Sequence, residues 1–475
     1  MSMRRRDALR TLGGLAGAAA LARFLPGCGT SEDGAPKGIT TYVYMMLENR
    51  SYDHVFGSRS FVEGLAGDGP PAAATNPDVN GAPVALWAPT KDMMCDQDPP
   101  HEWDALHASW NHGACDGFVK QYQKDYTGGI APMQYMTREM MPVSYALADA
   151  YTSCDRWFCS VMGPTWPNRF YWHCGQSDGL MTNEIPTGGI DFPSIYHRLN
   201  DKKVEWAYYY GTIPVVAVVS NLDVMTPAGK PRIKRFAQFL LDAAAGTLPP
   251  VVYIDPGFYE NDDHPPIHPI NGQELIATVY KALAASPQWN NIHFVITYDE
   301  NGGFYDHVSP PNGVPDDFAA TGFDQLGFRV PALVMGPYAK QNYVSSTVFN
   351  HASALAHLQN TFGLENLTMR TAAATDLTDT IDMERLLAND PAPPIELPEV
   401  NLADWPTMAA ACQYNSSAVV AGGAAPIGID PVSAWANAYP ERVAGMDARP
   451  DVQQYRKQIR DYLLHDILPG GKRQA

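Results

Sequence analysis

Acidic and amide side chains directly follow apolar, β-rich stretches at several places in this sequence. Glu48 and Asn49 follow TTYVYMML, Asp299 and Glu300 follow HFVITY, and His264 lies in NDDHPP shortly after VVYID. A single acid at such a position is most often a cap or a turn residue. Carboxylate and amide oxygens that converge with a few histidines are, however, a suitable ligand set for a divalent metal ion. The recurrence of the pattern favours a metal or catalytic site over unrelated turns.

The segment GPTWPNR, residues 163–169, places a hydroxyl and a guanidinium on a stiff stretch of backbone. Its prolines and its glycine hold Thr165 and Arg169 at a fixed separation. Taken alone, the segment is most simply a rigid turn with Arg169 in a surface ion pair. A threonine hydroxyl is a weak nucleophile at neutral pH and needs an adjacent base or a metal ion. The acidic residues could supply that metal, which makes Thr165 a candidate nucleophile.

Alternating strands and helices are needed if these residues are to meet. The pattern predicts strands at residues 39–47, 204–210, 251–254, 292–298 and 330–335, and helices at residues 134–153, 233–245, 272–285, 353–362 and 451–468. This alternation predicts an α/β fold with a large, mainly parallel sheet flanked by helices. The carboxyl ends of parallel strands lie along one edge, where distant residues converge. We expect a single domain over residues 39–475, with long loop insertions and a C-terminal helical segment.

The N-terminal segment is typical of an export signal. Arg5 and Arg6 begin the twin-arginine pattern RRDALR, and an apolar stretch of small residues follows. This stretch is too short, and is interrupted by Arg23, to be a transmembrane helix. The ending LPGC resembles a lipoprotein processing site, which would leave Cys28 lipidated, although the proline before its glycine is unusual there. We therefore expect a twin-arginine signal over residues 1–28, a linker over residues 29–38, and a periplasmic, membrane-anchored or secreted protein.

The net charge and the cysteine content exclude some classes of binding site. A formal charge of −18 and a pI near 5.0 would repel a polyanion, so nucleic-acid binding is excluded as the main role. The chain has 7 cysteines, so an even number remains if Cys28 is lipidated, and in an exported protein this favours disulfides. Their spacing contains no paired Cys-x-x-Cys pattern of a zinc site. Cys412 is most simply interpreted as a free buried thiol.

Further motifs occur along roughly residues 40–365, in the order LENRSYDHVFG, GPTWPNR, NDDHPP, TYDENGGFYDHV and RVPALVMGPYAK. Together they resemble the bacterial phosphoesterase family of phospholipases C and acid phosphatases, which belongs to the alkaline phosphatase-like superfamily. The resemblance implies an alkaline phosphatase-like α/β fold. It further implies a metal-dependent hydrolase of phosphate esters that acts through a threonine nucleophile.

The resemblance also implies roles for individual residues. The implied metal residues are Glu48, Asn49, Asp299 and Glu300, together with Thr165, which is also the implied nucleophile. The implied catalytic residues are Thr165, Arg169, His307 and the two phosphate-facing histidines, His101 and His264. His54 and His351 are expected to be structural residues at helix starts. The metal ion stays open between Ca²⁺, Mg²⁺ and Mn²⁺, which prefer oxygen ligands, and Zn²⁺ or Fe, which a histidine ligand would admit.

Two departures from the family pattern leave the substrate open. Trp166 stands where related phospholipases often carry histidine, and the chain has no counterpart of the paired β-rich C-terminal domains of the larger phospholipases C. A phospholipid and a soluble phosphate ester, diester or monoester, therefore both remain candidates. A sulfatase-like hydrolase is disfavoured, because TWPNR resembles a Cys-x-Pro-x-Arg core but threonine cannot be converted to the aldehyde that sulfatases need. An exported lipoprotein that binds phosphate or a lipid headgroup without catalysis is the alternative from another class.

Overall fold

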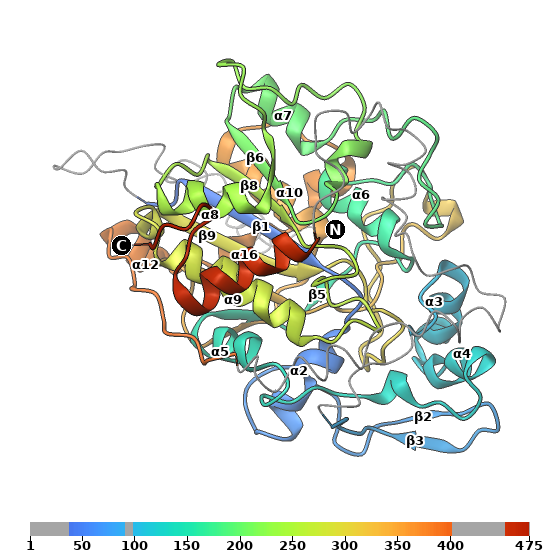
Figure 1. Cartoon of the computed structure of the whole chain (residues 1–475). Coiled ribbons are helices and arrows are strands. Elements are labelled where there is room, and N and C mark those ends of the chain that lie inside the picture. Colours follow the sequence, from blue (N-terminus) through green and yellow to red (C-terminus); the bar gives the residue numbers. More distant parts are fainter. Residues whose placement is uncertain (1–37, 91–97, 401–451, 475) are drawn as a thin grey trace, which may run out of the picture.

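The computed structural model describes residues 38–90, 98–400 and 452–474, and its core is one eight-stranded sheet (Figure 1). The strands lie in the order β11-β4-β10-β9-β1-β8-β6-β7. Their bounds are β1 Thr41–Leu47, β4 Thr152–Cys154, β6 Trp206–Tyr210, β7 Ile233–Arg235, β8 Val251–Asp255, β9 Ile292–Tyr298, β10 Ala332–Met335 and β11 Tyr343–Ser345. β1 pairs in parallel with β8 and β9, whereas β10 runs antiparallel to β9 and β4. The predicted large, mainly parallel sheet is confirmed, with β10 as its antiparallel member.

Helices cover both faces of this sheet. Their bounds are α2 Tyr52–Phe61, α3 Trp103–Trp110, α4 Phe118–Asp125, α5 Pro142–Ala150, α6 Thr165–Cys174, α7 Ile195–Asp201, α8 Phe236–Ala244, α9 Ile270–Ala284, α10 His351–Phe362, α11 Met369–Ala373, α12 Met383–Ala388 and α16 Val452–His465. The Tyr208 ring on β6 contacts His173 of α6, and the next residue, Tyr209, contacts Phe239 of α8. α8 packs with α9 and α16, and α6 packs with α7 and α10. Figure 1 shows α8, α9 and α16 together on the near side of the strands.

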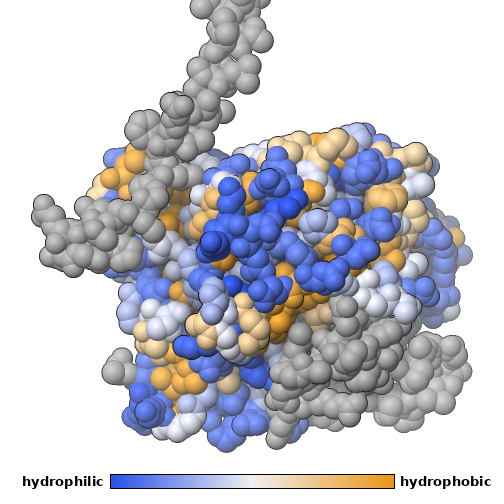
Figure 2. Space-filling view, turned by 90° about the horizontal axis from the view of Figure 1, so that it is seen from above, coloured by the Kyte–Doolittle hydropathy of each residue, from blue (hydrophilic) through white to orange (hydrophobic). Residues whose placement is uncertain are grey.

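The central strands explain why the sheet was predictable. β1 reads TYVYMML and β9 reads IHFVITY, and both are buried along their whole length. A parallel strand that is covered on both faces needs such a nearly continuous apolar run. The molecular surface combines hydrophilic and hydrophobic residues. Figure 2 shows hydrophilic residues grouped in the middle of the face seen from above. Within the described part of the chain, no helix has the length and apolar character needed to cross a membrane.

Short strands account for the differences from the predicted elements. Residues 233–235 form β7 in parallel with β6, so the helix predicted over residues 233–245 begins only at Phe236. The helix predicted over residues 134–153 is limited to α5, which starts with Pro142, and β4 follows it. The remaining short strands form two small sheets, β2 (Thr75–Pro77) with β3 (Pro83–Ala85) and β5 (Trp157–Phe158) with β12 (Phe349–Asn350). A strand of two or three residues is too short to show a periodic pattern in sequence.

The cysteines differ from the expectation of disulfides. Cys115, Cys154, Cys159 and Cys174 are all free and buried. Burial raises the pKa of each of these thiols, which keeps them protonated and unreactive. The disulfide prediction is therefore wrong for these cysteines. Cys28, Cys95 and Cys412 lie outside the described residues.

Candidate active site

The ends of β1 and β9 bring the predicted metal residues together. These strands are parallel neighbours, so Glu48 and Asp299 begin their two loops side by side. Asn49 has a φ of 59°, a left-handed conformation that asparagine tolerates, and its backbone N–H donates to Oδ1 of Asp299 at 3.0 Å. The backbone N–H of Glu300 donates to the same oxygen at 2.7 Å. The predicted convergence of these residues at one sheet edge is confirmed.

Three buried oxygens of this group have no hydrogen-bond partner: Oδ1 of Asn49, Oδ2 of Asp299 and Oε1 of Glu300. Buried polar atoms in native proteins are nearly always paired, and an uncompensated buried carboxylate is costly. Burial raises the pKa of Glu300 well above its usual range, and the charge of Asp299 adds to this effect. A divalent cation bound by these oxygens would give each of them a partner and would compensate the buried carboxylate charge. The residues present therefore fit such an ion.

Thr165 is the first residue of α6, at the positive end of a ten-residue helix. Asn168 holds the preceding turn, because its Oδ1 accepts from the N–H of Val161 at 3.1 Å and its Nδ2 donates to the carbonyl of Gly163 at 2.9 Å. The GPTWPNR motif is thus a helix start rather than an isolated turn. Its prolines fit because the first turn of a helix has no intrahelical N–H bonds to lose.

Arg169 fixes α6 against the end of β1. Its Nε and Nη2 lie 3.1 and 3.0 Å from Oε1 of Glu48, and its Nη1 lies 3.4 Å from Oδ1 of Asp255. The Arg169 side chain is 0% exposed, so the surface ion pair suggested by the segment alone is wrong. These contacts hold Arg169 between Glu48 and Asp255, and its catalytic role stays a prediction. Thr165 lies four residues before Arg169, on the face of α6 from which Arg169 contacts Glu48.

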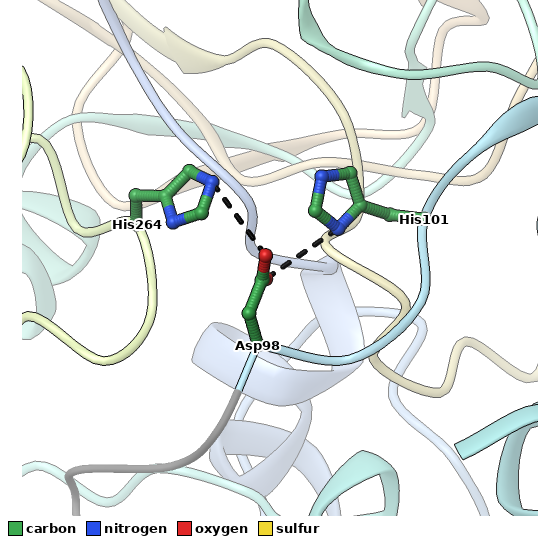
Figure 3. A group of neighbouring side chains, drawn as sticks. All are labelled: Asp98, His101 and His264. Carbon is green, nitrogen blue, oxygen red and sulfur yellow. Dashed lines mark ion pairs between the residues drawn. The ribbon is translucent and has the colours of Figure 1, made fainter. Parts of the chain in front are cut away.

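A second group contains Asp98, His101 and His264 (Figure 3). Asp98 lies between the two imidazoles, with Oδ1 3.4 Å from Nδ1 of His101 and Oδ2 3.9 Å from Nε2 of His264. Nδ1 of each imidazole also lies near a backbone carbonyl oxygen, at 2.8 Å for His101 and 2.6 Å for His264. Nδ2 of Asn49 is 3.3 Å from Nε2 of His101, which joins this group to the metal residues. The structure thus brings together both predicted phosphate-facing histidines.

The surroundings of these two histidines shift their pKa values in opposite directions. Burial lowers the pKa of His264. Burial also opposes protonation of His101, but the carboxylates of Asp98 and Glu300 outweigh it and raise the pKa of His101 to about 10. These shifts favour the protonated form of His101 and the neutral form of His264 near neutral pH. Asp98 was not predicted from the sequence, where the segment DPPH places it three residues before His101.

The loop that carries His264 is supported from two directions. The backbone carbonyl of Asp262 accepts from the N–H of Glu48 at 2.8 Å, and Oδ1 of Asp262 accepts from the N–H of His264 at 3.1 Å. On the other side, the hydroxyl of Tyr455 on α16 lies 3.1 Å from Nδ2 of Asn261. A Cβ at residue 257 would lie 2.7 Å from the Tyr455 ring, so the contact requires glycine there. The predicted C-terminal helix is confirmed and braces the His264 loop.

His307 lies in a separate ion-pair network. Its Nδ1 is 2.7 Å from Oδ2 of Asp53, and Nη2 of Arg329 is 2.7 Å from Oδ1 of the same carboxylate. Nε of Arg329 is 2.9 Å from Oδ1 of Asp306. In the contacts recorded for the described residues, nothing joins His307 directly to Thr165 or His264. The structure therefore places His307 in a network with Asp53, Asp306 and Arg329 rather than beside Thr165 or His264.

We expect His307→Gln to change hydrolysis by no more than a few-fold while removing a pH-dependent part of the stability. Burial opposes protonation of His307, but Asp53 outweighs it and raises its pKa above the ordinary value of about 6.5. The ion pair therefore stabilises the fold fully below about pH 6.5 and is lost as the pH rises through the raised pKa. Melting curves across this range should show a difference from wild type that shrinks with rising pH. A large loss of turnover, with His112→Gln at an exposed site as control, would restore His307 to the catalytic residues.

Two other histidines have the structural positions that the sequence predicted. His54, in the first turn of α2, stacks on Phe304 with ring centroids 3.8 Å apart, and burial lowers its pKa well below the usual value. His351 begins α10, and its Nε2 lies 2.7 Å from the backbone oxygen of Asp299. His351 thus supports the backbone of a predicted metal residue without entering the group itself.

Comparison with known proteins decides the family. The sequence model of the Phosphoesterase family matches residues 39–365. The chain belongs to this family. The phosphoesterase is 31% identical over 397 residues to non-specific phospholipase C6 of Arabidopsis thaliana, which covers 76% of this chain and 75% of that protein. It is 32% identical over 421 residues to phospholipase C B of Mycobacterium tuberculosis, which covers 76% of this chain and 80% of that one.

The family assignment confirms the predicted resemblance and the class of enzyme. This phosphoesterase is a phosphoric ester hydrolase. Among solved structures, the lipoteichoic acid synthase LtaP from Listeria monocytogenes aligns with a TM-score of 0.38 and 10% identity, covering 74% of this chain and 79% of that chain. This structural likeness is too low to support any statement about the site.

Proposed function

We propose that this phosphoesterase is a divalent-metal-dependent enzyme that hydrolyses the phosphodiester of a phospholipid headgroup through Thr165. The observation that carries the proposal is the set of unpartnered buried oxygens of Asn49, Asp299 and Glu300 at the sheet edge where β1 and β9 end. The phospholipid class is supported by the relatives, which are named phospholipases C and match about three quarters of the chain.

The proposed reaction assigns one task to each residue. A divalent ion, held by Glu48, Asn49, Asp299, Glu300 and Thr165, would supply charge neutralisation and a lower pKa for the threonine hydroxyl. The Thr165 hydroxyl loses its proton to solvent, and its Oγ1 attacks phosphorus in line, forming a phosphothreonine as the bond to the alcohol breaks. The negative charge of a bound phosphodiester would raise the lowered pKa of His264, which then protonates the departing alcohol oxygen, and His101 holds a phosphoryl oxygen. Water then cleaves the phosphothreonine and regenerates the hydroxyl.

The identity of the ion follows from the donor atoms. The proposed ligands are carboxylate, amide and hydroxyl oxygens, which suit Ca²⁺, Mg²⁺ or Mn²⁺. A histidine ligand would be needed to favour Zn²⁺ or Fe. His101 is the histidine that lies next to the group, and its Nε2 is already 3.3 Å from Asn49. We therefore propose an ion that prefers oxygen ligands.

Hydrolysis of two chromogenic substrates tests this function. p-Nitrophenylphosphorylcholine contains the phosphodiester of a lipid headgroup, and p-nitrophenyl phosphate is the corresponding monoester. We expect the purified protein to release p-nitrophenol from the diester, and a chelator to stop the release. Release from the monoester alone would make the enzyme a phosphatase. If metal is bound but p-nitrophenol is released from neither substrate, the result would favour a binding protein without catalysis.

Export belongs to the same proposal. The pattern RRDALR supports the twin-arginine route, and LPGC supports a lipid tether at Cys28 that would hold the enzyme at a membrane surface. Both segments lie outside the described residues. A phospholipid substrate would be available to an exported enzyme in either the tethered or the released form.

A further inference from the structure

A buried chain of polar contacts leads from Glu48 to strand β6. Arg169 contacts Oε1 of Glu48 at 3.0 Å and Oδ1 of Asp255 at 3.4 Å. Oδ2 of Asp255 accepts from the Tyr208 hydroxyl and, at 2.9 Å, from the N–H of Val215. We call Tyr208, Asp255, Arg169 and Glu48 the Tyr208 chain. Its members come from four different elements or their ends, β6, β8, α6 and β1, and each is buried.

Each member of the Tyr208 chain depends on the next. A buried guanidinium needs compensating carboxylates, and Arg169 has Glu48 on one side and Asp255 on the other. Burial raises the pKa of Asp255, whereas Arg169, Tyr208 and the Val215 N–H oppose this shift. The Tyr208 hydroxyl therefore helps to keep Asp255 charged and fixed in orientation. Without it, Asp255 would hold Arg169 less firmly, and the guanidinium could turn together with the carboxylate of Glu48.

We propose that Tyr208 and Asp255 are positioning residues that orient Glu48 towards the divalent cation, acting through Arg169. This inference rests on the proposed function, in which Glu48 belongs to the cation site. Neither residue touches the unpartnered oxygens of the site in any recorded contact. Outer partners of this kind typically change metal affinity by about 10- to 100-fold when they are lost.

The next residue on β6 offers a matched control. Tyr209 faces the opposite side of the sheet, and its hydroxyl donates to Oδ2 of Asp242 on α8 at 2.6 Å. Tyr208→Phe and Tyr209→Phe each remove one hydroxyl that donates to a carboxylate, from adjacent positions of one strand. Asp242 keeps its ion pair with Lys234 at 2.9 Å when the Tyr209 hydroxyl is removed, so Tyr209→Phe should lose no more thermal stability than Tyr208→Phe. Only Tyr208 belongs to the Tyr208 chain, which leads to Glu48.

The test is the affinity of the metal-free full chain for Mn²⁺, measured by titration calorimetry. We expect Tyr208→Phe to weaken Mn²⁺ binding by about tenfold or more, and Tyr209→Phe to leave it within about twofold of wild type. Unchanged affinity in Tyr208→Phe, or an equal loss in both variants, would overturn the inference. If Tyr208→Phe fails to fold, Asp255→Asn, which keeps the shape of the side chain, is expected to show the same loss. A wild-type protein that binds no divalent ion would overturn the proposed function as well, so the two failures are distinguishable.

Discussion

Replacement of Thr165 by alanine is expected to reduce turnover by at least about 10³-fold while leaving the fold nearly unchanged and weakening metal binding only by the loss of one of five proposed ligands. Removal of a nucleophile eliminates the covalent pathway, and the activity that remains comes from binding and charge stabilisation alone. Thr165 is 7% exposed and begins α6, where alanine is acceptable to the helix. Steady-state hydrolysis of p-nitrophenylphosphorylcholine, with Mn²⁺ binding measured in parallel, checks the prediction.

Two further variants make this result specific. Thr165→Ser keeps the hydroxyl and should retain activity within about tenfold of wild type, since serine can play the same nucleophilic role. His264→Ala should cost about 10²- to 10⁴-fold with a poor leaving group, because it removes a general acid. The loss should be smaller with p-nitrophenol, which leaves without a proton. Equal and mild losses in Thr165→Ala and His264→Ala would show that the two roles are wrongly assigned.

Removal of divalent ions is expected to abolish hydrolysis and to lower the melting temperature. Asp299 and Glu300 each present an unpartnered buried oxygen, so without a cation their charges repel one another in a poorly solvated place. An ion present at about 100 times its Kd would stabilise the native state by about 2.7 kcal/mol. Melting curves with EDTA, and after Mg²⁺, Ca²⁺, Mn²⁺ or Zn²⁺ is added back, measure this effect and rank the ions.

Asp299→Asn supplies the control for the chelation experiment. The amide keeps an oxygen for the N–H groups of Asn49 and Glu300 but removes one negative charge. This variant should bind the ion weakly, so EDTA should change its melting temperature little. A wild-type protein that keeps its activity and melting temperature in EDTA would contradict the metal proposal. If EDTA lowers the melting temperature of wild type and of Asp299→Asn by the same amount, the ion must bind at another site.

The sheet could be predicted because its central strands are continuous apolar runs. β9 was predicted at its observed bounds, and β1 within two residues of them, because strands buried on both faces cannot alternate with polar residues. Residues 233–235 were assigned to a helix because three residues cannot show a period, and only pairing with β6 makes them a strand. The antiparallel course of β10 is likewise set by pairing between distant segments.

The site was predictable where a residue directly follows a strand or lies in a family motif. Glu48 and Asp299 follow adjacent parallel strands, so the edge on which they meet follows from the topology. Asp98 could not be ranked above other acids, because its position between two histidines depends on a loop path. His307 follows the metal pair closely in sequence, but Arg329, which lies near it only in the fold, draws it into another network.

The brace between Tyr455 and the His264 loop has a consequence for the timing of biosynthesis. Helix α16 supplies Tyr455 from the far end of the described chain, whereas the loop that it supports follows β8 near the middle. A ribosome-bound chain can already contain every residue of the proposed reaction and still lack this support. Domains tend to fold as units as the chain is synthesised, but this contact can form only after residues 452–465 have emerged. The C-terminal helix would thereby delay the proposed hydrolysis until residues 452–465 have been synthesised and have packed against the loop.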